Sequence, residues 1–233
     1  MARWNNSTQT DEEVNRLKRE AVLRESGRLF SRHGYHNTSL ENIAAALGVS
    51  KATLYNYVRD KQEILFTFHN MAMSIGERAA DAAEQSGLNG AGKIKFSIAT
   101  YIADVSAELG GYGVIAEIGA LRPADRKIVV DRRHKLDRRF IRMVEEGIAD
   151  GSLRSVDPGM AVFTFLGALQ LVPNWFSPDG RLTGREVAEA TADILVYGMA
   201  VQVQVDMSAA PDQPSDSLLT VHKRAKKSLK ARK

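Results

Sequence analysis

The chain has 233 residues, of which 44% are hydrophobic and 26% charged, a composition typical of a folded globular protein. It contains no cysteine, which excludes disulfides, thiolate metal sites and cysteine nucleophiles. The net charge of +4 is unevenly distributed. Residues 1–62 carry ten Lys and Arg against seven Asp and Glu, residues 63–222 carry fifteen against twenty-one, and the last eleven residues carry seven basic residues and no acid. This segregation suggests a nucleic-acid contact at one or both ends.

Helical periodicity dominates the chain and no strand-like alternation is convincing, so the predicted fold class is all-α. Polar residues that can cap a helix stand before several segments: Thr10 before the first, Thr38 or Ser39 before the second, Ser50 before the third and Asp60 before the fourth. The helices are expected over about residues 11–33, 40–47, 51–59, 61–86, 92–109, 111–120, 124–150, 158–173 and 183–205. From residue 206 the composition changes to Ala, Pro, Asp and Ser and then to a basic run, which predicts a disordered basic tail over 206–233.

Residues 158–178 contain no charged side chain over a length that could span a bilayer. Prolines and polar residues interrupt this stretch, and its strongly apolar part is only about Met160–Val172. We therefore expect a helix buried on several sides and no membrane contact. The first residues lack an apolar signal segment, so a cytoplasmic location is expected.

The segment from Thr38 to Lys61 predicts a helix-turn-helix, because two short helices are separated by a tight turn at Gly48. Small Ala44 is expected where the two helices cross. The inner face is expected to consist of Ile43, Leu47, Val49 and Leu54. In this geometry the second of the two helices enters the DNA major groove with its N-terminal residues leading. An ordinary three-helix packing unit with a polar surface would fit the same pattern.

The exposed face of residues 51–57 has the residue types that read DNA. Tyrosine hydroxyls can bond phosphates, and the side chain of Asn56 can bond adenine through two hydrogen bonds. Lys61 and Ser39 stand at helix starts, where phosphates bind readily.

The stretch 30–65, FSRHGYHNTSLENIAAALGVSKATLYNYVRDKQEIL, resembles the N-terminal domain of TetR/AcrR-type transcriptional regulators. The shared positions are Gly34-Tyr35, Thr38-Ser39, Ile43-Ala44, Gly48-Val49-Ser50, Leu54-Tyr55 and Lys61. The resemblance implies a homodimeric repressor with a helix-turn-helix domain over 1–62 and a helical ligand-binding and dimerisation domain over 63–205. It implies a palindromic double-stranded DNA operator and release by a small-molecule effector. The DNA-binding positions carried over are Ser39, Ser50, Lys51, Thr53, Tyr55, Asn56, Tyr57 and Lys61.

In this family the last two long helices form the dimer interface, which would be 158–173 and 183–205 here. The interface candidates are Phe163, Leu166, Leu171, Trp175, Leu195 and Met199. Polar or aromatic residues on mostly apolar helices are the ligand-binding candidates, each of which would also fit ordinary core packing: His69, Met73, Phe96, Tyr101, Glu117, Met143, Phe163 and Gln170. The segment Asn174-Trp175-Phe176 followed by residues 178–180 resembles a turn in family members that respond to acyl-CoA-like ligands. Five arginines at 132, 133, 138, 139 and 142 favour a solvated helix face over a phosphate site.

The sequence has no glycine-rich phosphate loop, no metal-ligand spacing and no nucleophile–base set, so no enzyme, cofactor or metal site is predicted. Two other functions stay open. One is a sequence-tolerant DNA-binding module that takes much of its affinity from the basic tail. The other is a helical ligand-binding or catalytic protein in which the helix-turn-helix is incidental. The sequence identifies neither the effector nor the operator, and it does not separate repression from activation.

Overall fold

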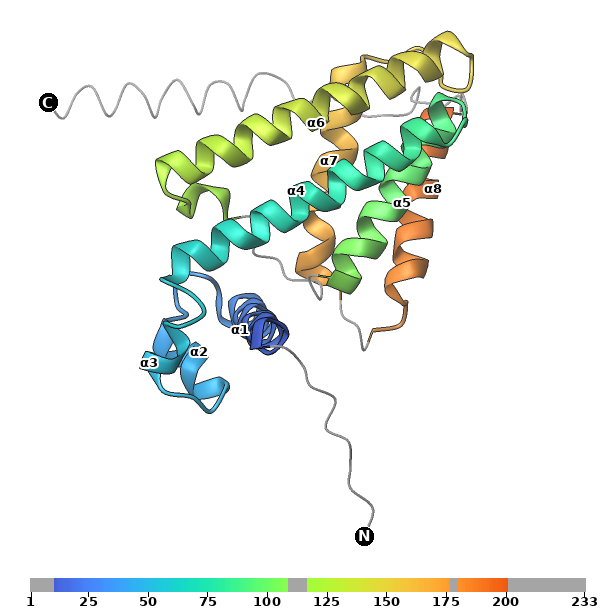
Figure 1. Cartoon of the computed structure of the whole chain (residues 1–233). Helices are drawn as coiled ribbons and strands as arrows, with labels where there is room; N and C mark the ends of the chain where they lie inside the picture. The colour runs from blue at the N-terminus through green and yellow to red at the C-terminus, as the bar shows by residue number, and fades with distance from the viewer. Residues whose placement is uncertain (1–10, 109–116, 177–179, 201–233) are drawn as a thin grey trace, which may run out of the picture. The chain divides into compact units, whose positions relative to one another are not determined.

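The computed structural model of the chain describes residues 11–108, 117–176 and 180–200. Within these ranges the chain is all-α, as predicted, and has no strand. Its elements are α1 (Asp11–His33), α2 (Leu40–Ala46), α3 (Lys51–Leu54), α4 (Lys61–Gln85), α5 (Gly90–Glu108), the 3₁₀ helix η2 (Ile118–Ala120), α6 (Pro123–Ala149), α7 (Pro158–Trp175) and α8 (Gly184–Ala200) (Figure 1).

Two predicted helices differ from the structure. The third was expected over 51–59, but α3 ends at Leu54 and the chain continues in turns to Tyr57. The helix expected over 111–120 is wrong in the part that can be checked, because only η2 is found there and residues 109–116 lie outside the described ranges. The predicted cap at Thr10, the helix end at 201–205 and the tail at 206–233 also lie outside the described residues.

Local capping explains why α2 and α3 begin where they do. The side chain of Ser39, not of Thr38, caps α2: its oxygen accepts a hydrogen bond from the amide of Asn42, whose own side chain accepts one from the amide of Ser39. Gly48 makes the turn with φ of +67°, a left-handed conformation that glycine takes without strain. Ser50 then caps α3 by accepting from the amide of Thr53.

One buried cluster joins α1, α2 and α3 to the first half of α4. Ile43 and Leu54 have no exposed surface, and Ala44 is buried beside them, as expected for the inner face of the helix-turn-helix. Leu47 is only half-buried, and the prediction for Val49 is wrong because its side chain is 38% exposed. In the turn, the amide of Val49 donates a hydrogen bond to the carbonyl of Ala44, and its side chain points outward.

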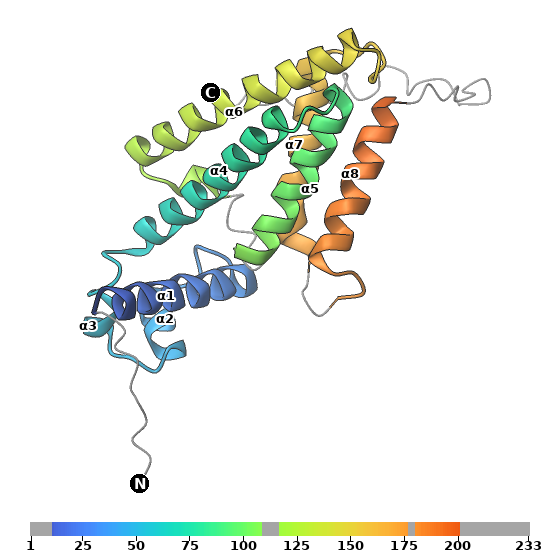
Figure 2. The ribbon, with the colours of Figure 1, turned by 45° about the vertical axis from the view of Figure 1, so that its right-hand side comes forward.

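A second buried cluster lies among α4, α5, α6, α7 and α8. Helix α5 packs against α8 on one side and against α4 and α6 on the other (Figure 2). Its first residue, Gly90, lies so close to α6 that a Cβ there would be 2.1 Å from the amide nitrogen of Gly147. None of the helices in the described ranges is long and apolar enough to cross a membrane.

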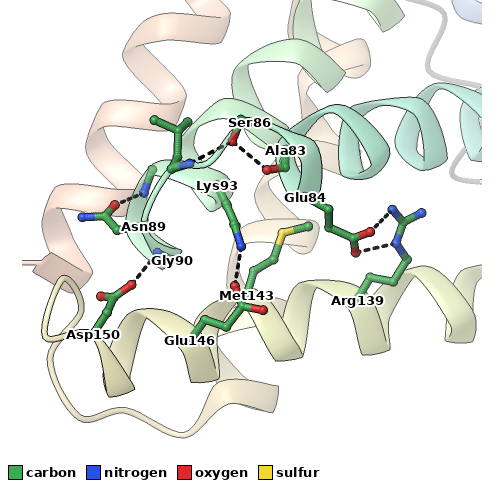
Figure 3. A network of polar contacts seen from close by, with 12 residues as sticks. Ala83, Glu84, Ser86, Asn89, Gly90, Lys93, Arg139, Met143, Glu146 and Asp150 are labelled. Atoms are coloured by element: carbon green, nitrogen blue, oxygen red, sulfur yellow. Dashed lines mark hydrogen bonds and ion pairs between the residues drawn. The ribbon is translucent and has the colours of Figure 1, made fainter.

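Side-chain hydrogen bonds and ion pairs join the C-terminal ends of α4 and α6 to the N-terminal end of α5 (Figure 3). Arg139 of α6 makes two hydrogen bonds with the carboxylate of Glu84 on α4, at 2.9 and 2.7 Å. Lys93 of α5 pairs with Glu146 at 2.7 Å, and the carboxylate of Asp150 accepts from the amide of Gly90 at 2.8 Å. These bonds join the three helices at the end of α4 that is distant from α3.

Candidate functional site

The exposed surface of the helix-turn-helix is formed by α3 and the turn that follows it. Lys51, Tyr55 and Asn56 are exposed, whereas Leu54 and Val58 point into the core. The amide of Asn56 donates to the carbonyl of Thr53, which continues a helical turn beyond the end of α3. A polar face with one aromatic ring, one amide and one ammonium thus projects from a rigid base.

The other predicted DNA-binding side chains lie around this face. Ser50 is exposed, and its hydroxyl is 2.8 Å from that of Thr53, which is half-buried. Ser39 and Tyr57 are also half-buried. All of them except Lys61 lie on α3, its flanks or the start of α2, and the Lys61 ammonium reaches the start of α2 by donating to the carbonyl of Thr38.

Two basic side chains of this site already have partners. Lys51 forms an ion pair with Glu41 of α2, and this pair lowers the pKa of the Glu41 carboxyl to about 2. The ammonium of Lys61 donates to the carbonyl oxygens of Tyr35 and Thr38 at 2.8 and 2.9 Å, and it lies 4.3 Å from the centre of the Tyr35 ring. Burial lowers the pKa of Lys61. In this conformation Lys61 ties α4 to the turn between α1 and α2, so the predicted phosphate contact would have to share its ammonium with these carbonyls.

A cavity of about 80 Å³ lies among α4, α5, η2, α6 and α7. Most of its walls are apolar, with Ile98, Phe140 and Phe165 among them. A cavity needs roughly 10–15 Å³ to hold one water molecule, so this one has room for a small organic group. Of the candidate ligand-binding residues, those that line it are His69, Met73, Tyr101 and Gln170.

The other four candidates do not line this cavity, so the structure does not bring them to the predicted site. Phe96 and Phe163 are exposed on the outer faces of α5 and α7. Met143 is buried in the core against Ser97, and Glu117 lies 3.7 Å from the imidazole of His36. These residues were predicted from their residue type alone, but the rotation of each helix about its axis decides whether a side chain points into the cavity or away from it.

Two further residues line the cavity: Asp137, which was not predicted as a site residue, and Arg133, which was expected on a solvated helix face. They lie on α6 within an apolar stripe, Val129, Leu136 and Phe140, that has helical spacing. Charged residues in such a stripe were the available signal. The arginines of α6 do not form a merely solvated face either, because Arg132 and Arg139 pair with acids of α4.

Three ionisable groups in the cavity are strongly affected by burial. His69 is 2% exposed, and burial, with a contribution from the positive charge of Arg133, lowers its pKa to about 4. Burial also raises the pKa of Tyr101 to about 12 and raises that of Asp137. The Nε2 of His69 and the Oδ1 of Asp137 have no hydrogen-bond partner among the described residues.

A junction joins the cavity wall to the start of α4. Ile118 of η2 lines the cavity, and the carbonyl of nearby Ala120 accepts a hydrogen bond of 2.6 Å from the Gln62 side chain. The same Gln62 side chain accepts from the amide of Arg122 at 3.2 Å. Arg122 in turn donates to Asp60 at 2.6 Å, the residue that caps α4 directly after the helix-turn-helix.

Two family models match the chain. Residues 22–67 match the family described as bacterial regulatory proteins, tetR family, and residues 89–199 match the tetracyclin repressor-like C-terminal domain. Together they cover more than half of the chain, including the helix-turn-helix and the cavity-lining residues of α5, η2, α6 and α7. The chain belongs to the TetR family of transcriptional regulators.

Individual relatives agree with this assignment. A TetR-family regulator from Thermus thermophilus, PfmR, is 26% identical with a TM-score of 0.67, over 76% of this chain and 97% of that one. AibR, solved in complex with isovaleryl coenzyme A and operator DNA, is 28% identical with a TM-score of 0.64, over 77% and 98% of the two chains. The HTH-type transcriptional regulator YhgD of Bacillus subtilis is 21% identical, over 78% of this chain and 97% of its own length.

TetR-family proteins are DNA-binding regulators and not enzymes, and most are ligand-responsive repressors that act as dimers. The candidate dimer surface lies on α7 and α8. Phe163, Leu171 and Trp175 are exposed on α7, with Phe163 at 70%. Leu166 is half-buried at the cavity. Leu195 and Met199 pack partly against the core of their own chain, so the outward side of α8 presents Ile194 and Tyr197, which the sequence analysis did not select.

Proposed function

We propose that this TetR-family protein is a repressor that binds a palindromic operator as a homodimer and releases it when a small molecule fills the cavity. The observation that carries this proposal is the course of α4. Its first residue follows the helix-turn-helix, and three of its later residues, His69, Met73 and Gly76, line the cavity. A ligand that moves α4 would therefore move the DNA-reading surface.

An acyl-CoA-like effector is the candidate that the comparisons favour. AibR, whose structure was solved with isovaleryl coenzyme A, is similar to this chain over most of both lengths. The mainly apolar walls of the cavity suit a short acyl chain, because the free energy falls when apolar surface is removed from water.

The exposed face of α3 is proposed to read the operator. In a dimer of this kind the two copies of α3 would enter successive major grooves about 34–36 Å apart, or a multiple of one helical turn. An effector that shifts this spacing needs a coupling of about 1–3 kcal/mol to lower operator affinity roughly 5- to 150-fold.

Selection of bound sequences from random double-stranded DNA tests the proposal. We expect a palindrome with two half-sites, and deletion of residues 207–233 should leave this preference intact while it reduces sequence-independent affinity. In the variant Asn56→Ala, one half-site position should lose its base preference, at a cost of about 1–3 kcal/mol. Gln85→Ala, an exposed change at the far end of α4, is the matched control and should bind as the wild type does. Selection that yields no palindrome would overturn the proposal.

A further inference from the structure

The cavity contains polar groups whose hydrogen-bonding capacity the described chain does not use. His69 is almost completely buried, and its Nε2 has no hydrogen-bond partner among the described residues. The Oδ1 of Asp137, on the opposite helix, has none either. A buried polar atom without a partner destabilises the fold, so such atoms in a cavity wall indicate a ligand that completes their hydrogen bonds.

The charges in the cavity wall cancel. Arg133 and Asp137 are four residues apart on α6, so they lie on the same face with opposite charges. They form no ion pair within the described residues, which leaves both available to a ligand. His69 and Tyr101 are neutral near pH 7, because their pKa values are about 4 and about 12. The remaining charges near Asp137, those of His134 and Arg138, lie on exposed side chains where water screens them.

A wall with no net charge disfavours an ionised ligand. A carboxylate or an ammonium that enters the apolar cavity loses its hydration, and it meets one attractive and one repulsive charge. A hydroxyl group is uncharged, so it loses much less hydration free energy than an ion and can replace its lost hydrogen bonds with those of the cavity wall. Its oxygen can accept from the Arg133 guanidinium while its hydrogen is donated to the unpartnered oxygen of Asp137.

We propose that the part of the effector enclosed by the cavity is a small, mainly apolar and uncharged group that carries a hydroxyl, selected in preference to a carboxylate on the same carbon skeleton. This inference rests on the proposed function, in which the cavity is the effector site. It narrows the acyl-CoA-like class to molecules whose buried end is a neutral hydroxyl-bearing chain.

Binding of matched probes to the full chain tests this selection. The probes are straight-chain primary alcohols of four to eight carbons, the methyl ethers of the same alcohols, and the corresponding carboxylates at pH 7.5. Calorimetry and ligand-induced shifts in Tm report binding without DNA. We expect at least one alcohol to bind tenfold or more tightly than its carboxylate, and its ether, which lacks the donor, to bind more weakly as well.

A charge-neutralising variant adds a second measurement. In Asp137→Asn the cavity keeps a polar side chain and gains a net positive charge from Arg133, so the preference for the alcohol over the carboxylate should fall to about one or reverse. The control Asp131→Asn lies on the same helix, at an exposed site paired with Lys127, and should keep the wild-type preference.

Three outcomes would overturn the inference: no alcohol binds the wild type, the carboxylate binds as tightly as the alcohol, or Asp137→Asn discriminates as the wild type does. If the alcohols bind as expected but no ligand releases the operator, the inference stands and the proposed function fails. The wild-type series decides the question even if the variant does not fold.

Discussion

His69 lies in the cavity wall as a neutral imidazole, and this has a consequence for stability as well as for binding. Its pKa in the folded chain is about 4, below the value of about 6.5 for an unfolded chain. The unfolded state therefore takes up a proton first as the pH falls. The stability associated with neutral His69 is complete above pH 6.5 and is lost as the pH falls towards 4.

We predict that the free energy of unfolding of the wild type falls by about 2 kcal/mol more than that of His69→Leu between pH 7.5 and 5. Urea denaturation at one protein concentration measures this difference. The exposed histidine variant His134→Gln should follow the wild type. Parallel pH profiles of the wild type and His69→Leu would contradict the neutral, buried imidazole.

Single residues were predictable from the sequence where their partners are close along the chain. The caps at Ser39, Ser50 and Asp60 depend on amides three residues away, and their residue types mark them. Lys61 was predicted to bind phosphate because it stands at the start of a helix. Its ammonium instead donates to backbone carbonyls 23 to 26 residues earlier in the chain, which no local pattern predicts. Asp137 had a sequence signal in the apolar stripe of α6, but only the packing of α6 on α4 and α5 shows that this stripe faces a cavity.

At the scale of elements, the least predictable part is η2, and it is also the part that joins the cavity to α4. Periodicity predicted a longer helix there, since the apolar residues of the segment have helical spacing. The structure instead has a short 3₁₀ helix. Its last residue, Ala120, accepts a hydrogen bond from Gln62, and Arg122, two residues later, donates to Asp60. Bonds over about 60 residues of chain fix this segment, and no local signal predicts them.

We predict that Gln62→Glu uncouples the cavity from the DNA-reading surface. The carboxylate cannot donate to the carbonyl of Ala120, and two acceptors would then face each other. The ratio of operator Kd with and without a releasing effector should fall towards one, while the Kd of the effector itself changes by less than about threefold. Fluorescence anisotropy with labelled operator and calorimetry with the effector measure the two quantities.

The control for this change is Gln85→Glu, which introduces the same charge at the other end of α4. It should keep the wild-type ratio. By thermodynamic linkage, the operator must alter effector affinity by the same factor, which gives an independent check of the ratio. A Gln62→Glu variant with unchanged coupling would show that the hydrogen bonds of the junction do not transmit effector binding from the cavity to the DNA-reading surface.

At the scale of the whole molecule, the exposed apolar side chains of α7 and α8 need an explanation. Phe163 and Ile194 are 70% and 75% exposed, although large apolar patches on monomers are uncommon. The uncharged composition of 158–178 indicated a helix covered on several sides, whereas the described residues of the chain bury only one side of α7. Which residues of α8 complete the surface could not be predicted, because Leu195 and Ile194 are adjacent and equally apolar.

We predict that Phe163→Glu and Ile194→Glu each convert the proposed homodimer into a monomer, since a carboxylate buried at an apolar interface would have no partner. Analytical ultracentrifugation measures the mass, and operator binding should lose its tight, two-half-site mode. Ile128→Glu, an exposed apolar position on α6, should remain a dimer. A dimer that survives both substitutions would place the interface elsewhere.

The close approach of Gly90 to Gly147 restricts how α5 and α6 can move relative to each other. With the ion pairs beside it, this contact fixes one end of α4, α5 and α6, so the fixed end acts as a pivot. Helix α4 has 25 residues and extends about 37 Å from this pivot to the helix-turn-helix. A tilt of only about 5° then moves the far end of α4 by about 3 Å, close to the 3.4 Å rise of one base pair. Under the proposed function, a ligand in the cavity would therefore need to tilt α4 only slightly to put the reading surface out of register with its operator, without unfolding any helix.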